Sequence, residues 1–284
     1  MESFLDCIPC LVGQCVRAVR LATPDERLQR DAVNAVLEHL TTVDLSRSPI
    51  ALSVEPHRII RQVTGCADPY LGVRRRSNRE ALALYPRLKR IVAESTDPLM
   101  TATRIAIAGN IMDFGALAGF DVEAALARAL REPFGLDDSA LYAARVRDAR
   151  RVLFVADNAG EIVFDRVLLE ELTGRELTVA VKSSLFINDA LRADAEETGI
   201  GEIATIIEAP PGTSDPADFG EAWGSADLII AKGQANYEAF ANTIAPLFSL
   251  LLIKCPILAQ MAGLSPQSMA LVSRQSGPVR TETA

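Results

Sequence analysis

Polar residues follow four short apolar runs in the second half of the chain, and their types could bind a metal ion. Asp157-Asn158 comes directly after "RVLFVA", and Asn188-Asp189 follows "LTVAV" after a short loop. The runs "DLIIA" and "FSLLLI" lead into Lys232-Gly233-Gln234 and Lys254. Two aspartates and an amide oxygen, with no histidine or thiol beside them, are hard ligands of the kind that Mg²⁺ and Mn²⁺ prefer.

The two lysines and a helix expected to start at Gly160-Glu161 could neutralise an anion beside such a metal. Backbone N–H groups at a helix N-terminus bind phosphate, and ammonium groups add charge-assisted hydrogen bonds. Aspartate and asparagine are also favoured helix caps, so Asp157-Asn158 alone could be a local capping pair. Four polar loops at one sheet edge favour a binding site over capping.

The segments that carry these residues predict a mostly parallel sheet covered by helices. Five uniformly apolar runs, "RVLFVA", "LTVAV", "ATIIE", "DLIIA" and "FSLLLI", alternate with helical stretches at 161–173, 188–198 and 236–243. Buried strands separated by helices are typical of a three-layer, Rossmann-like α/β/α domain. Because ligands bind beyond the carboxyl ends of such strands, the polar loops should converge on one edge.

The first half of the chain has an almost purely helical pattern. In "DERLQRDAVNAVLEHLTTV" and "SNREALALYPRLKRIVAES", apolar residues recur every three or four positions behind an Asp, Ser or Asn start. We therefore predict an N-terminal helical domain over residues 1–147 and an α/β metal- and phosphate-binding domain over 148–263. The periodicity is lost from Leu264, which predicts a flexible tail over 264–284.

Composition and charge indicate a folded protein and narrow its partners. Hydrophobic residues make up 49% and charged residues 23% of the 284 positions, as in globular proteins. The net charge of −8 disfavours nucleic acid or an anionic membrane as the main partner. The longest apolar run, "IAPLFSLLLIKCPILAQMA", is broken by two prolines and Lys254, so it predicts a strand and a turn rather than a membrane span.

The N-terminal residues and the cysteines predict a cytoplasmic protein. "MESFLDCIPC" carries acids where a signal peptide has basic residues, and five cysteines, an odd number, suggest thiols in a reducing compartment. Cys7 and Cys10 have CxxC spacing. A packed structural role and an auxiliary metal or redox site are both open for this pair.

Other common enzyme signatures are missing from the sequence. It contains no GxGxxG, no GxxxxGK[ST] and no GxSxG, so dinucleotide binding, a P-loop and a serine-hydrolase elbow are not indicated. The two histidines, His39 and His57, are expected to be structural or exposed.

Seven blocks carry a resemblance to a known family. They are "CIPC" (7–10), "DPY" (68–70), "AIAGNIMDFG" (106–115), "DNAGEIVFD" (157–165), "NDALRADAEETGI" (188–200), "ADLIIAKGQANYE" (226–238) and "LLIKCPILA" (251–259). Together they resemble the metal-dependent damage-control phosphatases, once catalogued as domain of unknown function 89. The resemblance spans nearly the whole chain and is nearest to the branch with an N-terminal CxxC.

The resemblance implies roles for the polar residues of these blocks. Asp157, Asn158 and Asp189 would hold a divalent metal, which could be Mn, Co, Ni or Mg. Asp157, Asp189 and Lys254 would be the catalytic residues. With the neighbouring strand-end residues, the predicted substrate contacts are Asn110, Asp113, Gly160, Glu161, Lys232, Gln234, Asn236 and Lys254. The sequence departs from the family pattern at Ala235, where "KGQGN" is usual, and in "SSLFIND", which lacks a proline, and both changes should bear on substrate choice.

The resulting prediction is a metal-dependent hydrolase of small phosphorylated metabolites, such as sugar phosphates or damaged phosphometabolites. The metal would polarise the phosphoryl oxygens and the lysines would offset negative charge, with direct water attack and an aspartyl-phosphate both open. A first alternative is a protein that binds metal and phosphometabolite without catalysis. A second is an adenosylmethionine-dependent carboxyl methyltransferase, although "DNAGE" has a single glycine where such enzymes have a Gly-rich loop. The oligomeric state is not indicated.

Overall fold

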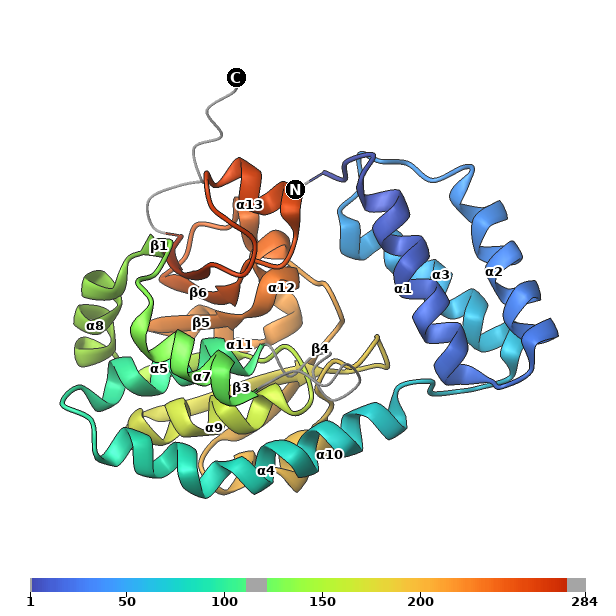
Figure 1. Cartoon of the computed structure of the whole chain (residues 1–284). Coiled ribbons are helices and arrows are strands. Elements are labelled where there is room, and N and C mark those ends of the chain that lie inside the picture. The colour runs from blue at the N-terminus through green and yellow to red at the C-terminus, as the bar shows by residue number, and fades with distance from the viewer. Residues whose placement is uncertain (1, 111–121, 275–284) are drawn as a thin grey trace. The chain divides into compact units, whose positions relative to one another are not determined.

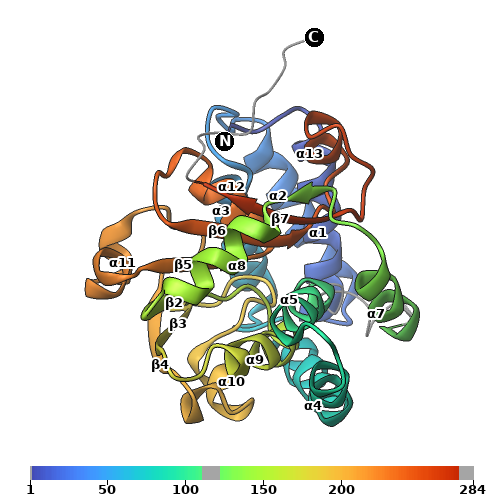
Figure 2. The ribbon, with the colours of Figure 1, turned by 90° about the vertical axis from the view of Figure 1, so that its left-hand side faces the viewer.

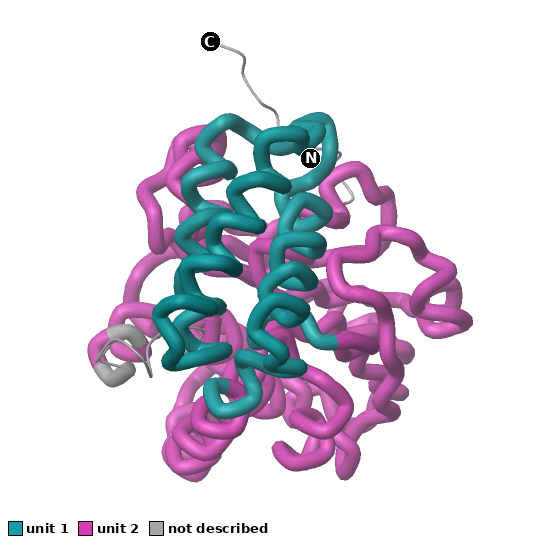
Figure 3. The backbone as a smooth tube through the Cα atoms, turned by 90° about the vertical axis from the view of Figure 1, so that its right-hand side faces the viewer, with its two compact units in different colours: residues 1–73, 185–188 teal, residues 74–184, 189–284 magenta. Residues whose placement is uncertain are grey.

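The computed structural model describes residues 2–110 and 122–274 and divides the chain into two compact units (Figure 1). The smaller unit comprises Met1–Val73 and Leu185–Asn188, and the larger comprises Arg74–Ser184 and Asp189–Ala284 (Figure 3). Asp113, one of the predicted substrate contacts, lies outside the described residues.

The smaller unit is built from three helices, α1 (Cys7–Ala22), α2 (Glu26–Leu40) and α3 (Pro49–Thr64), which share an apolar core. Asp25 and Ser48 cap α2 and α3 by accepting hydrogen bonds from the first turn of each helix. The short segment 185–188 also belongs to this unit, and its Phe186 ring packs edge-on against His57 at a centroid distance of 5.6 Å. Burial lowers the pKa of His57 to about 4, so this histidine is neutral and structural, as expected from the sequence.

The larger unit contains a seven-stranded sheet in its described part, with strand order β1-β7-β6-β5-β2-β3-β4. All neighbouring pairs are parallel except β6 and β7. The strands are β1 (Leu136–Asp137), β2 (Arg151–Val155), β3 (Glu176–Lys182), β4 (Thr205–Ala209), β5 (Leu228–Lys232), β6 (Leu247–Leu252) and β7 (Met269–Ser273). A mixed α/β fold with a mostly parallel sheet and N-terminal helices is thereby confirmed.

Helices cover both faces of this sheet because alternate strand residues point to opposite sides. Figure 2 shows α5 and α9 on one side and α11 on the other. Phe154 and Ile230 share a core with α5 and α9, whereas Leu153 and Ile229 pack with the aromatic rings near α11. The helices are α4 (Leu71–Ala93), α5 (Pro98–Gly109), α7 (Val122–Arg131), α8 (Ser139–Asp148), α9 (Glu161–Glu171), α10 (Arg192–Glu197), α11 (Glu221–Ser225), α12 (Gly233–Ala239) and α13 (Pro256–Met261).

The division of the chain differs from the predicted domains. Most of α4 and the helices α5, α7 and α8 begin within the predicted helical domain but belong to the larger unit, because they bury their apolar faces in the core of the sheet. Residues 264–284 were expected to form a tail, yet β7 lies within them and pairs with both β6 and β1. No helix in the described ranges is long and apolar enough to cross a membrane.

The strand order creates a switch point between β2 and β5. From β2 the chain proceeds outward to β3 and β4, and it then returns to β5 on the other side of β2. At such a point the loops after the two strands diverge and leave room for a ligand at the carboxyl edge. After β2 the chain continues with Ala156-Asp157, and after β5 it enters α12 at Gly233.

Candidate functional site

The carboxyl end of β2 brings Asp157 and Asn158 to Asp189. Asn158 and Asp189 form an isolated antiparallel bridge, and the Ala190 N–H donates to the Asp157 carbonyl oxygen at 2.9 Å. Asp157 and Asp189 are 7% and 8% exposed, so both carboxylates are buried at this edge. Two of the predicted polar loops therefore meet through backbone hydrogen bonds.

Two asparagine amides connect Asp157 to Glu161. Asn110 Nδ2 donates to Asp157 Oδ2 at 3.1 Å and to Glu161 Oε2 at 2.8 Å. Asn158 Nδ2 donates to the same two oxygens at 2.8 and 3.0 Å. Both amides thus direct their nitrogens at carboxylates. The Oδ1 atom of Asn110 is buried without a hydrogen-bond partner in the described part of the chain, which is the kind of acceptor that a cation or a donor would satisfy.

Lys232 forms a fully buried ion-pair network on the far side of Glu161. Its Nζ donates to Glu161 Oε1 at 2.7 Å, to Asp165 Oδ1 at 2.5 Å and to the Ala106 carbonyl oxygen at 2.8 Å. An ammonium group has three N–H donors, and these three acceptors use all of them. Lys232 and Glu161 are each 0% exposed, so both predicted substrate contacts lie beneath the surface of the site.

The network shifts the pKa values of its two acids in opposite directions. Burial opposes ionisation of Glu161, but the charges of Lys232 and Lys254 and the hydrogen bonds of Lys232 and Asn158 outweigh it and lower its pKa. Burial raises the pKa of Asp165 to about 7, and the Glu161 charge adds to this rise although Lys232 opposes it. Glu161 is therefore the ionised partner of Lys232, and Asp165 is the acid that titrates near neutrality.

We expect an Asp165→Asn variant to gain stability relative to the wild type as the pH rises. The pKa of Asp165 is raised from 3.8 to about 7 in the fold, so its contribution to stability is present below pH 3.8 and lost as the pH rises through 7. An asparagine does not titrate and keeps the shape of the protonated acid. Urea denaturation of both proteins at pH 5 and pH 8 measures the effect. An equal difference in unfolding free energy at the two pH values would contradict the assigned pKa.

Gly233 allows the Asp157 carboxylate to lie against the start of α12. Its φ is +78°, and a Cβ at this position would lie 1.8 Å from Asp157 Oδ2. No side chain fits there without moving that carboxylate or the helix. Glycine is therefore required at position 233, after β5, because the side chain of Asp157, after β2, occupies the space of a Cβ.

A Gly233→Ala variant should lose metal affinity and about 1–3 kcal/mol of stability, because strain and a clash act together. Gly174→Ala is the matched control, since Gly174 has φ +90° but nothing within 4 Å of its Cβ position. Calorimetric metal titration and thermal unfolding of both variants give the comparison. We expect a larger loss of metal affinity and of thermal stability for Gly233→Ala than for Gly174→Ala, and equal losses would contradict the role of Gly233.

The backbone amides at the start of α9 are largely engaged within the protein. The Gly160 N–H donates to Asn78 Oδ1 at 2.7 Å, and the Ile162 N–H donates to the Asn158 carbonyl oxygen at 3.2 Å. A Cβ on Gly160 would lie 2.7 Å from the Cβ of Ser77 in α4. Gly160 therefore serves the packing of α9 against α4, and its own N–H group is not open to an anion.

Asn236 in α12 and Lys182 at the end of β3 are joined by a hydrogen bond. Asn236 Nδ2 donates to the carbonyl oxygens of Ala156 and Lys232 at 3.2 and 2.7 Å, and its Oδ1 accepts from Lys182 Nζ at 3.1 Å. Lys182 is absent from the sequence prediction. The available signal was its place at the end of the apolar run "LTVAV", in the same manner as Lys254 follows "FSLLLI".

Gln234 ties two loops of the carboxyl edge together. Its Oε1 accepts from the backbone N–H groups of Lys254 and Cys255 at 3.2 and 3.0 Å, and its Nε2 donates to Glu238 at 2.8 Å. Lys254 itself is half-buried, and its charge helps to lower the pKa of Glu161. The positive charge of Lys254 therefore acts on the Glu161 carboxylate.

The side chains that meet at the carboxyl edge favour a metal bound by few carboxylates. No group of three or more His, Cys, Asp and Glu side chains within residues 2–110 and 122–274 is arranged to hold a metal. Asp157 and Asp189 would thus need the Asn158 amide, and water, to complete a coordination shell. Mg²⁺ and Mn²⁺ accept such a shell of mixed oxygen ligands.

The CxxC pair belongs to the smaller unit and lies at the start of α1. Cys7 is half-buried and Cys10 is exposed. The Cys7 sulfur accepts a hydrogen bond from the Phe4 N–H at 3.4 Å. An auxiliary metal or redox role for this pair stays a prediction.

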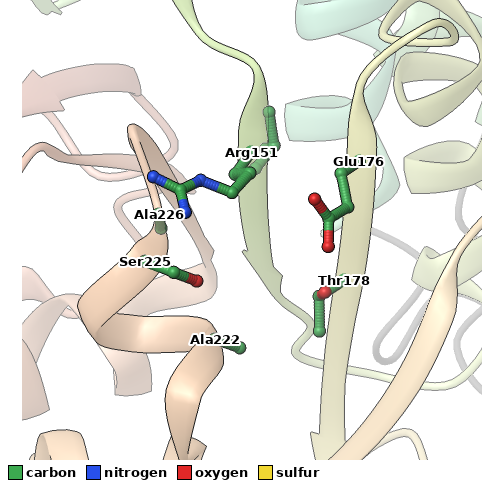
Figure 4. A pocket seen from close by; sticks show the side chains of 7 residues that line it. Arg151, Glu176, Thr178, Ala222, Ser225 and Ala226 are labelled. Atoms are coloured by element: carbon green, nitrogen blue, oxygen red, sulfur yellow. The ribbon is translucent and has the colours of Figure 1, made fainter.

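A shallow pocket lies at the opposite edge of the sheet from the carboxyl-edge site (Figure 4). Arg151 and Glu176, which line it, are the first residues of β2 and β3. Arg151 is paired with Asp227 at 3.6 Å. The pocket contains none of the predicted site residues.

The matches to known proteins extend over almost the whole chain. Residues 3–269 match the family described as damage-control phosphatase ARMT1-like domain. The chain is 32% identical to a damage-control phosphatase of Archaeoglobus fulgidus, covering 93% of this chain and 96% of that protein. It is 29% identical to the damage-control phosphatase PH1575 of Pyrococcus horikoshii, with 92% and 94% covered, and 29% identical to the uncharacterized protein MJ0202 of Methanocaldococcus jannaschii, with 95% and 94% covered.

The fold leads to the same group of proteins. A crystal structure of the DUF89 family protein PH1575 from Pyrococcus horikoshii is similar with a TM-score of 0.85 at 27% identity, over 96% of this chain and 99% of that one. The resemblance inferred from the sequence blocks is confirmed. This chain belongs to the damage-control phosphatase ARMT1-like family.

Proposed function

We propose that this protein is a divalent-metal-dependent phosphatase of small phosphorylated metabolites, with Asp157, Asn158 and Asp189 as the metal-binding residues. The observation that carries the proposal is the meeting of these three residues at the switch point of the sheet in a chain of this family. When bound, the divalent ion supplies Lewis-acid polarisation of the phosphoryl oxygens.

The donor atoms around Asp157 support a hard cation. Both Asn110 and Asn158 turn their Nδ2 groups toward Asp157 and Glu161, so their Oδ1 atoms point elsewhere. The buried Oδ1 of Asn110, which has no hydrogen-bond partner among the described residues, adds an oxygen acceptor to this set. Gly233 allows the Asp157 carboxylate to lie against the start of α12. Oxygen ligands of this type suit Mn²⁺, Mg²⁺, Co²⁺ or Ni²⁺ without selecting among them.

The remaining side chains divide into those that could meet a substrate and those that support them. Lys254 is half-buried at the end of β6, so it can face a phosphorylated ligand, whereas the amide of Asn236 is buried and hydrogen-bonded within the protein. Lys254 would offset charge on the transferred phosphoryl group. Lys232 and Glu161 are buried and mutually bonded, and their role in this proposal is to orient the amides around Asp157.

The polar lining favours a hydroxylated substrate. Each buried donor or acceptor that a ligand leaves unpaired costs about 1–3 kcal/mol, so a ligand with several hydroxyl groups suits such walls better than an apolar one. Sugar phosphates and similar metabolites meet this requirement. The net charge of −8 is a further disadvantage for nucleic acid as a substrate.

A metal-stripped preparation tests the proposal. We expect no phosphatase activity in the presence of a chelator and recovery on addition of Mn²⁺, Co²⁺, Ni²⁺ or Mg²⁺. In the recovered enzyme, sugar phosphates should be hydrolysed faster than phosphopeptides. Full activity without metal would exclude the proposed centre, and metal and phosphate binding without turnover would identify a binding protein instead.

A further inference from the structure

Lys182 is a buried cation for which the described part of the chain provides no anionic partner. The residue is 6% exposed, and its Nζ has one hydrogen bond, to the neutral Asn236 Oδ1 at 3.1 Å. An ammonium group has three donors, so two of them remain without an acceptor among the described residues. A buried charge without counter-charge is costly, and such groups occur where a ligand supplies the missing partner.

Lys232 differs from Lys182 in the acceptors that surround its ammonium group. Lys232 has three acceptors for its three donors, and two of these are carboxylates. Its charge is neutralised inside the protein, and no face of the ammonium remains for a ligand. Lys182 lies at the end of β3, the strand next to β2, and none of the described residues compensates its charge.

Hydrogen bonds connect Lys182 to the two segments that carry Asp157 and Asp189 of the proposed metal site. Its N–H donates to the carbonyl oxygen of Ala190, the residue after Asp189, at 2.9 Å. Its partner Asn236 donates to the carbonyl oxygen of Ala156, the residue before Asp157, at 3.2 Å. The backbone of Lys182 is thus bonded to the loop that carries Asp189, and its ammonium is linked through Asn236 to the segment that carries Asp157.

We propose that Lys182 is a substrate-binding residue whose ammonium contacts the phosphoryl oxygens of the substrate, and that Asn236 orients it. This inference rests on the proposed phosphatase function and assigns a cation that the sequence prediction did not include. It gives the phosphoryl group positive charge from Lys182 and Lys254, which follow β3 and β6, while Lys232 at the end of β5 remains structural. Two positive groups beside a metal would balance a doubly charged phosphate monoester.

The test is phosphate binding by Lys182→Met, with inorganic phosphate as the probe and Mn²⁺ present throughout. We expect phosphate to bind about 10- to 100-fold more weakly than to the wild type, because a charge-assisted hydrogen bond is lost. The affinity for Mn²⁺ should remain within about twofold, since none of the proposed ligands changes. Lys182→Arg should recover part of the phosphate affinity. Lys89→Met is the matched control, because Lys89 is half-exposed and paired with Glu170, and it should leave both affinities unchanged.

Thermal unfolding separates a binding role from a structural one. Without phosphate, Lys182→Met should be at least as stable as the wild type, since an uncompensated buried charge is replaced by an apolar chain of similar length. Phosphate should raise the Tm of the wild type but not that of the variant. A variant that fails to fold, or that is less stable in the absence of phosphate, would show that Lys182 is structural.

The outcomes also distinguish this inference from the proposed function. Equal phosphate affinity in the wild type and in Lys182→Met would overturn the role of Lys182 and leave the metal-dependent phosphatase intact. A wild-type protein that binds neither Mn²⁺ nor phosphate would overturn both.

Discussion

Replacement of Lys232 by methionine is expected to destabilise the protein by about 3–5 kcal/mol, which is the scale observed when one partner of a buried ion pair is removed. The loss of stability follows from the two buried acids that Lys232 contacts. Glu161 and Asp165 are both 0% exposed, and Lys232 supplies the only cation bonded to either of them in the described ranges. Without it, two carboxyl groups remain buried at a place where one of them must be ionised to hold two asparagine amides.

The pH dependence of this loss identifies its cause. Buried carboxyl groups without a cation have raised pKa values, so the variant should take up protons and recover stability toward low pH. The difference in unfolding free energy between the wild type and Lys232→Met should therefore be smaller at pH 5 than at pH 8 in urea titrations. Adding Asp165→Asn to Lys232→Met should recover part of the loss. A pH-independent difference of less than 1 kcal/mol would mean that the three groups are not an ion-pair network.

Replacement of Asp157 or Asp189 by alanine should have the largest effect on activity. We expect kcat/KM to fall by roughly 10³-fold or more, because the residues proposed to hold the metal are lost together with the charge stabilisation that it supplies. The fold should persist, since Glu161 still accepts from both asparagine amides and one of two neighbouring negative charges is removed.

A matched surface variant controls for the loss of a carboxylate. Asp148 is exposed at the end of α8, and Asp148→Ala should retain full activity. Steady-state kinetics with a sugar phosphate and saturating Mn²⁺ compare the three variants, and circular dichroism checks the fold. Wild-type kcat/KM in Asp157→Ala or Asp189→Ala would remove that residue from the proposed centre.

The strands and their ends could be predicted from the sequence because each signal is local. A uniformly apolar run such as "RVLFVA" is typical of a buried parallel strand, and it corresponds to β2. The carboxyl edge follows from the direction of such strands, so Asp157-Asn158 and Asp189 could be assigned to one edge before the fold was known. The bridge between Asn158 and Asp189 agrees with that assignment.

The division into units could not be predicted in the same way. The helix α5 has the same periodicity as the helices of the smaller unit, but it packs against α9, where a Cβ on Gly109 would lie 2.6 Å from the Cβ of Phe164. That close contact joins residues that are far apart in the sequence, so no local sequence pattern predicts it. The predicted boundary therefore followed the change from helices to strands, whereas the structure follows the packing.

The roles of the lysines also depend on distant partners. Lys232 is bonded to residues 126, 71 and 67 positions away, and Lys182 to a residue 54 positions away. From the sequence, each is simply a lysine at the end of an apolar strand. Only the three-dimensional arrangement reveals that Lys232 is fully paired and that Lys182 has a single, neutral partner for its ammonium among the described residues.

Titration of the metal-free protein with Mn²⁺ in a calorimeter tests the central claim most directly, because it needs neither a substrate nor an assumed reaction. We expect one Mn²⁺ ion to bind per chain in the wild type and in Asp148→Ala. We expect no Mn²⁺ binding in Asp157→Ala or Asp189→Ala. Equal Mn²⁺ affinity and stoichiometry in the wild type and in both site variants would contradict it.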